Sequence, residues 1–278
     1  MANQALINSA LAAHKSGNHA QAEQLYLEVI NDPGSVALIG TAKQLLGSLY
    51  SNLGHYPQAE ACMLASLTLK PEQPHVRNNL GVCYKRQGKF QPAMENFNLA
   101  ISLDPNYLAA YKNLINLFMD HTMYEQAAEI CQIALGVFPA DRGLTQQLAM
   151  SHQGLKQYAK ALKLLRALHD QAPEDPLVRH NLAVTLRLDN NPTEALEIFE
   201  GLITEAKEPS YELLQNKGNA HTDLGQLSEA SECFRKVIAL HPNYVPAHEN
   251  LTSILWNLGQ QPDYVNSYQA IIESGESD

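Results

Sequence analysis

PHVRNNLGVCYKRQGKFQPAMENFNLAISLDP, residues 74–105, is the stretch of the sequence that decides the fold. Apolar residues recur at helical spacing before and after Gly88, and Leu80 and Tyr84 belong to the first of these stripes. Pro105 ends the unit because proline cannot continue a helix. The stretch therefore predicts two short amphipathic helices, whose apolar faces need further copies on either side to be buried.

The same pattern restarts along most of the chain at a nearly constant period. With Pro74 counted as position 1, further repeats start at Gly40, Leu108, Arg142, Pro176, Tyr211 and Val245. The steps are 34 residues, with one of 35. Small residues are frequent at position 8, alanine at position 20 and proline at position 32. A fixed period of this length is the signature of a repeat fold.

The period, and the spacing of Leu80, Gly81, Tyr84, Ala93 and Phe97 within it, resemble the pattern of the tetratricopeptide repeat (TPR) family. The resemblance implies an all-α fold, a right-handed TPR α-solenoid of helix-turn-helix pairs with a concave groove. We expect a single TPR array with repeats at 3–39, 40–73, 74–107, 108–141, 142–175, 176–210, 211–244 and 245–278. The first and last repeats are degenerate, and the joint after the first is expected to be irregular.

Composition limits the classes of partner. The net charge is −10, of which −2 lies in residues 1–139 and −8 in residues 140–278. An acidic surface argues against a nucleic-acid partner, which needs a basic stripe. No segment approaches 18 consecutive apolar residues and the start lacks the pattern of a secretory signal, so no membrane partner is expected. Four cysteines without a CxxC pair are interpreted as buried reduced thiols, which favours a cytoplasmic location.

No catalytic motif stands out. The sequence holds no GxSxG, phosphate-binding loop, GxGxxG or HExxH pattern, so neither enzyme activity nor a cofactor is expected from this chain. His221 and Asp223 spell the HxD of a non-haem iron site. His221 stands at position 11, which is a packing position of a helix, so no metal site is expected there.

The TPR resemblance implies that positions 2, 5, 6, 9, 12 and 13 of each first helix line the groove. Position 6 is a carboxamide in seven of eight repeats, and Leu45 is the exception. The seven are Asn8, Asn79, Asn113, Gln147, Asn181, Asn216 and Asn250. Asparagine is a poor helix former because its side chain competes for backbone hydrogen bonds, so this recurrence needs a reason.

Two explanations of the carboxamides remain open. They could be structural, either bonding a neighbouring helix or simply belonging to the repeat consensus. Alternatively, they could form a ladder that holds the backbone of an extended peptide, since a carboxamide matches a peptide unit. Such a ladder is similar to the asparagine ladder in the TPR superhelix of O-linked N-acetylglucosamine transferase and in armadillo-repeat importins. Asn116 and Asn219, at position 9, are further candidates for peptide binding.

Lys85, Arg86 and Lys112 form a local basic patch on the predicted groove. The patch predicts an acidic stretch in the ligand, and ordinary solvated charges are the alternative. Lys112 and Asn116 also match the first pair of the carboxylate clamp in chaperone-binding TPRs. Gln147 and the pair Leu177 and Asn181 replace the other clamp residues, so binding of chaperone C-termini is not expected.

Two functions follow. The first is a protein-interaction scaffold that binds an extended peptide of a protein partner. The second is the targeting portion of a larger enzyme, because HENLTSILWNLGQ (248–260) resembles segments of bacterial TPR arrays fused to glycosyltransferase or 2-oxoglutarate/Fe(II) oxygenase domains. The last repeat is apolar and predicts either a cap of the stack or a surface for self-association, through Leu255, Trp256, Tyr264, Tyr268, Ile271 and Ile272.

Overall fold

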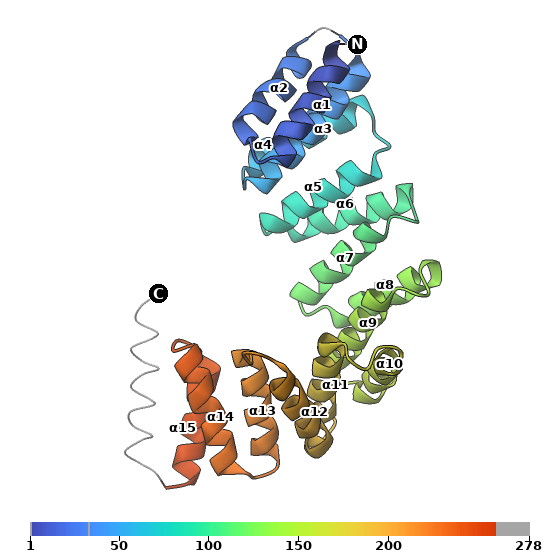
Figure 1. Cartoon of the computed structure of the whole chain (residues 1–278). Coiled ribbons are helices and arrows are strands. Elements are labelled where there is room, and N and C mark those ends of the chain that lie inside the picture. Colours follow the sequence, from blue (N-terminus) through green and yellow to red (C-terminus); the bar gives the residue numbers. More distant parts are fainter. Residues whose placement is uncertain (1, 33, 260–278) are drawn as a thin grey trace. The chain divides into compact units, whose positions relative to one another are not determined.

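The computed structural model describes residues 2–32 and 34–259, and over these residues the chain forms fifteen α-helices and no strand (Figure 1). In chain order they are α1 (Ala2–Lys15), α2 (His19–Asn31), α3 (Val36–Asn52), α4 (Tyr56–Leu69), α5 (Pro74–Arg86), α6 (Phe90–Leu103), α7 (Leu108–Asp120), α8 (Tyr124–Val137), α9 (Arg142–Gly154), α10 (Tyr158–Gln171), α11 (Pro176–Leu188), α12 (Pro192–Glu205), α13 (Tyr211–Asp223), α14 (Leu227–Leu240) and α15 (Val245–Asn257). Each predicted repeat supplies two of them, except that only the first helix of the last repeat is described.

The helices pack as the repeat pattern requires. The two helices of a repeat contact each other, as α3 contacts α4 and α5 contacts α6. First helices of successive repeats also contact, as α5 does with α7 and α11 with α13. The predicted all-α solenoid of helix pairs is confirmed. None of the described helices combines the length and the apolar character that crossing a membrane requires.

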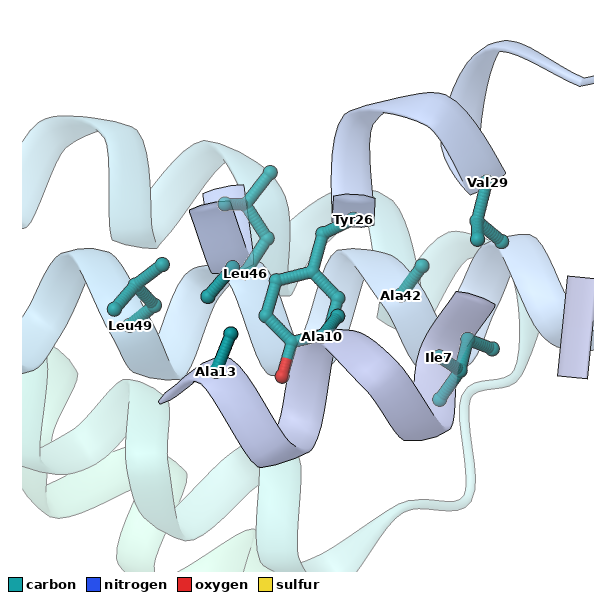
Figure 2. Close-up of a cluster of buried hydrophobic side chains, with 9 residues drawn as sticks. Ile7, Ala10, Ala13, Tyr26, Val29, Ala42, Leu46 and Leu49 are labelled. Carbon is teal, nitrogen blue, oxygen red and sulfur yellow. The ribbon is translucent and has the colours of Figure 1, made fainter. Parts of the chain in front are cut away.

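The helices divide into two compact units, Met1–Leu144 and Thr145–Asp278, with the boundary inside α9. The single continuous array stays a prediction. The irregular joint after the first repeat is observed, because α3 begins at Val36, four residues before the repeat start at Gly40, and has 17 residues where α5 has 13. A buried cluster joins α1, α2 and α3, and its members include Ile7, Ala10, Tyr26 and Leu46 (Figure 2).

Positions 8 and 24 of a repeat share one buried space between its two helices. A Cβ added to Gly81 would lie 2.6 Å from Cε1 of Phe97, and one added to Gly218 would lie 2.7 Å from Cε1 of Phe234. Repeat 4 reverses the sizes, with the fully buried Ile115 at position 8 and the fully buried Cys131 at position 24. The pair is therefore matched in volume, as a close-packed interior demands.

Small residues and special backbone angles complete each hairpin. The alanines at position 20 are all fully buried: Ala59, Ala93, Ala127, Ala161, Ala195 and Ala230. Position 15 is left-handed, with φ +70° at Gly88 and φ 56° at Thr122. Glycine adopts this conformation without steric cost, whereas a β-branched residue such as Thr122 does so only because the turn demands it.

The cysteines agree with the sequence interpretation. All four are free thiols: Cys83, Cys131 and Cys233 are buried, and Cys62 is half-buried. Burial raises the pKa of the thiols of Cys62, Cys83 and Cys233. Since the thiolate is the reactive form, these residues act as small packing groups rather than nucleophiles.

Candidate peptide-binding surface

The position-6 carboxamides of the first unit join first helices to one another. Asn79 donates from Nδ2 to Oγ of Ser48, at 3.2 Å, and so links α5 to α3. Asn113 donates from Nδ2 to Oδ1 of Asn78, at 2.8 Å, and so links α7 to α5. Asn78 is only 6% exposed, so its oxygen would lack a partner without Asn113. These two side chains therefore hold neighbouring repeats in register.

The second unit repeats this arrangement. Nδ2 of Asn216 lies 3.0 Å from Nε2 of His180, which connects α13 with α11. Nδ2 of Asn250 donates to Oδ1 of Asn219, at 3.1 Å, which connects α15 with α13. In each case the partner belongs to the first helix of the preceding repeat. Bonding between neighbouring helices, one of the two explanations that the sequence left open, is thus observed at four of the carboxamides.

The oxygens of these carboxamides differ in use: Oδ1 of Asn79 accepts a hydrogen bond from Nδ2 of Asn78, at 3.5 Å. Among the described residues, Oδ1 of Asn113 and Oδ1 of Asn216 accept no hydrogen bond, and neither atom is buried away from solvent. Because Nδ2 gives one of its two N–H groups to the preceding repeat, the orientation of the amide is fixed. Asn113 and Asn216 therefore each present a fixed acceptor oxygen, and one of the two N–H donors of each side chain is used within the protein.

The remaining carboxamides differ from this pattern. Asn8 is exposed and accepts a hydrogen bond within α1, from Nε2 of Gln4 at 3.2 Å. Asn181 is partly buried, and its buried Nδ2 donates no hydrogen bond among the described residues. Gln147 is partly buried on α9, and Asn116 is exposed on α7. Asn8 and Asn181 thus do not join repeats through their Nδ2 atoms.

The basic patch is partly neutralised. Nζ of Lys85 lies 2.6 Å from Oδ2 of Asp120, and Nζ of Lys112 lies 3.0 Å from Oδ2 of Asp141. Arg86 is exposed and forms no ion pair within the described part of the chain. The three side chains lie on α5 and α7 as predicted, but Arg86 is the one whose charge is not already matched.

An acid at the start of α9 is held in its charged form. Burial opposes ionisation of Asp141, but the backbone N–H of Leu144 and the ammonium of Lys112 outweigh it and keep the pKa of this carboxyl below its ordinary value. The same pattern of an ion pair between successive first helices recurs in the second unit, where Arg187 lies 3.0 Å from Asp223. Sequence analysis missed both pairings, because their partners stand 29 and 36 residues apart.

Side chains at position 11 make polar contacts in several repeats. His221 is 6% exposed and its Nδ1 lies 2.6 Å from Oε1 of Gln226, while Asp223 is paired with Arg187. Tyr50 and Tyr84, at the same position, donate from their hydroxyls to glutamates of the preceding repeat. No group of three His, Cys, Asp or Glu residues with metal-binding geometry occurs within residues 2–32 and 34–259. His221 is a packing residue, as predicted.

Acidification is expected to destabilise the fold through the buried His152 and the partly buried His180. Burial is the main reason that the pKa values of His152 and His180 lie below the ordinary 6.5. On unfolding both regain that value, so the unfolded state binds more protons as the pH falls below about 6.5. The contribution of the two neutral histidines to the free energy of unfolding is therefore complete above this pH and is lost as the pH falls below it. Urea midpoints at about pH 7.5 and pH 5.5 should show the decrease.

A double variant separates this effect from general acid denaturation. His152→Gln with His180→Gln is expected to flatten the pH dependence of the urea midpoint in this window. The exposed His241→Gln is the matched control and should keep the dependence of the wild type. An unchanged slope in the double variant would show that other groups cause the acid sensitivity.

Models of the tetratricopeptide repeat match the sequence at residues 3–28, 41–73, 76–107, 152–217 and 211–244. Among curated proteins, BBSome complex member BBS4 of Bos taurus is 20% identical over 225 residues, which cover 81% of this chain and 43% of that protein. The chain spans less than half the length of the first curated relatives that it matches.

Solved structures agree on the fold. A tetratricopeptide repeat protein from Parabacteroides merdae superimposes with a TM-score of 0.70 at 17% identity, over 91% of this chain and 98% of that one. YrrB, a TPR protein with an unusual peptide-binding site, gives a TM-score of 0.51 at 19% identity, over 66% of this chain and 95% of that one. At 17% and 19% sequence identity, these similarities establish a common fold.

Proposed function

Since the chain belongs to the tetratricopeptide repeat family, we propose that it is a protein-interaction scaffold whose first helices hold an extended segment of a partner protein. The observation that carries the proposal is the row of position-6 carboxamides, in which Nδ2 is bonded to the preceding repeat and Oδ1 accepts no hydrogen bond among the described residues at Asn113 and Asn216. Asn113 and Asn216 are its best-defined members. The peptide-binding site of YrrB, a protein of the same fold, supports peptides as the class of ligand.

The acceptor oxygens of the row determine which hydrogen-bonding groups the partner must supply. Carboxamide oxygens accept hydrogen bonds, so the partner supplies N–H groups, and every residue of an extended peptide except proline has one in its backbone. Each bond contributes about 1 kcal/mol, and ordering the peptide costs about 2–5 kcal/mol. The row alone therefore gives weak binding, of about micromolar affinity or poorer. Side-chain contacts must supply selectivity.

Removal of three carboxamides is expected to weaken peptide binding about tenfold or more, or about 1.4 kcal/mol per tenfold step. The change is Asn113→Ala, Asn181→Ala and Asn216→Ala together, and the ligand is a peptide selected on the wild-type chain from a random library. Calorimetric titration measures the affinity. Unchanged affinity would contradict the proposed row.

Two controls keep this result interpretable. The variant also loses the bonds from Asn113 and Asn216 to neighbouring helices, so circular dichroism must show an intact fold before titration. Alanine in place of Asn98 and Asn243, exposed asparagines outside the first helices, should leave affinity unchanged. A row of acceptors also needs peptide N–H groups, so methylation of alternate backbone nitrogens should abolish binding in one register and spare it in the other.

The basic patch adds a charge preference in the first unit. Because Lys85 and Lys112 are already paired, Arg86 carries most of the available positive charge. Arg86→Gln is expected to weaken binding of an acidic peptide by up to about fivefold and to reduce the salt dependence of the affinity. Titrations at low and high ionic strength measure both. Identical salt dependence in the variant and the wild type would exclude the patch.

A further inference from the structure

A pocket of about 460 Å³ opens at the junction of α3, α4 and α5, away from every residue discussed above as a binding candidate. Its apolar wall includes Val36, which is 59% exposed, and Leu69, which is 42% exposed. Its polar wall includes Lys70, Gln73 and His75. The volume lies within the range of ligand sites, about 300–1,000 Å³, and the mixture of apolar surface with a few polar groups is typical of them.

Hydrogen bonds within the protein hold the side chain of Gln73 in place in the wall of this pocket. It is 6% exposed, and its Nε2 donates to the carbonyl oxygen of Lys70 at 2.7 Å and to Ser66, at 3.3 Å to both the carbonyl oxygen and Oγ. Ser66 is fully buried and donates in turn to the carbonyl oxygen of Gly40, at 2.9 Å. This network fixes the orientation of the carboxamide. Its Oε1 accepts no hydrogen bond among the described residues and is left for a donor from outside.

The charge of the pocket is positive in a chain whose net charge is −10. No Asp or Glu lines it, and Lys70 forms no ion pair within the part of the chain that the structure describes. Desolvation, and then the charge of Lys70, hold the pKa of His75 below its ordinary value. Near neutral pH the positive charge therefore rests on Lys70. An occupant with a carboxylate, an N–H donor and a short aliphatic stem would match all the groups present.

The pocket occurs where the carboxamide row is interrupted. Leu45 occupies position 6 of this repeat and packs against the buried cluster of the first repeat instead of offering an amide. Gln44, next to it, lines the pocket, as does the extra turn of α3 that begins at Val36. The repeat whose position 6 is not a carboxamide thus has a cavity on the same helix.

We propose that this pocket binds a glutamate side chain of the partner segment. The stem packs against Val36 and Leu69, the carboxylate pairs with Lys70, and the backbone N–H of the same residue donates to Oε1 of Gln73. The inference rests on the proposed function and adds to it a residue-specific anchor. It predicts that segments held by this chain carry an acidic residue where they pass α3.

The test uses the full chain and a single-residue probe, N-acetyl-glutamic acid amide, with N-acetyl-glutamine amide as its neutral isostere. Methyl resonances of Val36 and Leu69 report binding. The glutamate probe is expected to shift them to saturation, and Lys70→Met is expected to weaken its affinity by about fivefold or more. Lys43→Met is the matched control, since Lys43 lies on α3 outside the lining, and it should leave the titration unchanged.

Three results would overturn the proposal: no saturable shift with the glutamate probe, equal affinity for the glutamine probe, or an unchanged titration in Lys70→Met. Lys70 is exposed at the end of α4, so its substitution leaves the core intact. The probe is one residue long and cannot span two repeats, so its result is independent of the carboxamide row. The proposal for the pocket and the proposal for the carboxamide row are thereby tested in separate experiments.

Discussion

Phe97→Ala should lower the free energy of unfolding by about 3–5 kcal/mol. The ring is fully buried between α5 and α6, and it occupies the space that Gly81 leaves open. Truncation removes the transfer energy of the ring and leaves a cavity, because no side chain at position 8 can move into it. Urea denaturation followed by circular dichroism measures the loss.

The control for this prediction lies on the same helix. Leu99 is 43% exposed on α6, so Leu99→Ala should change the free energy of unfolding by about 0.5 kcal/mol or less. A repeat contacts only its neighbours, so the loss at Phe97 should appear as earlier unfolding of the first unit. A loss below about 1 kcal/mol in Phe97→Ala would show that the hairpin collapses around the cavity.

Gly81→Ile should destabilise the chain by at least about 1–3 kcal/mol, and a second substitution should restore part of the loss. The added Cβ alone would lie 2.6 Å from the ring of Phe97, and the ring is fully buried. Phe97→Cys removes the obstacle. Together the two changes recreate in repeat 3 the pair Ile115 and Cys131 of repeat 4.

A double-mutant cycle measures this compensation. Gly81→Ile with Phe97→Cys should be more stable than the sum of the single losses predicts, by about 1–3 kcal/mol of coupling. Gly88→Ala on the same hairpin is a control without such coupling to Phe97, because its cost comes from the left-handed backbone and nothing lies within 4 Å of its added Cβ. Additive losses at Gly81 and Phe97 would contradict the matched pair.

The repeated pattern predicted the helices because each helix buries apolar residues that lie close together in the sequence at helical spacing. The spacing of Leu80, Tyr84 and Phe97 placed the two helices of repeat 3, and both form as predicted. Gly88 marked the turn correctly, since a left-handed residue favours glycine. Lys156, in the same turn position of repeat 5, gave no such signal and adopts φ 58° all the same. The part of the last repeat that includes Tyr264 and Tyr268 lies outside the described residues.

The candidate site was less predictable. The recurrence of asparagine at position 6 was visible, but which end of Asn113 is free depends on Asn78 of another repeat. Lys85 looked like a free cation until α7 brought Asp120 to it. The pocket around Gln73 carried no signal, because Gln73 stands outside the repeat positions that suggested a groove.

The amino-acid sequence alone specified the helices, their turns and the stacking of repeats. The reason is that the spacing of apolar residues depends on neighbours in the sequence and recurs in every repeat. The packing of repeats on one another decided the rest. It bonded the nitrogen of Asn113 to Asn78, paired Lys85 with Asp120, and gave the ammonium of Lys70 no ion pair within residues 2–32 and 34–259. Hydrogen bonds and ion pairs depend on distances of a few ångströms between residues about one repeat apart, and only the folded chain sets those distances.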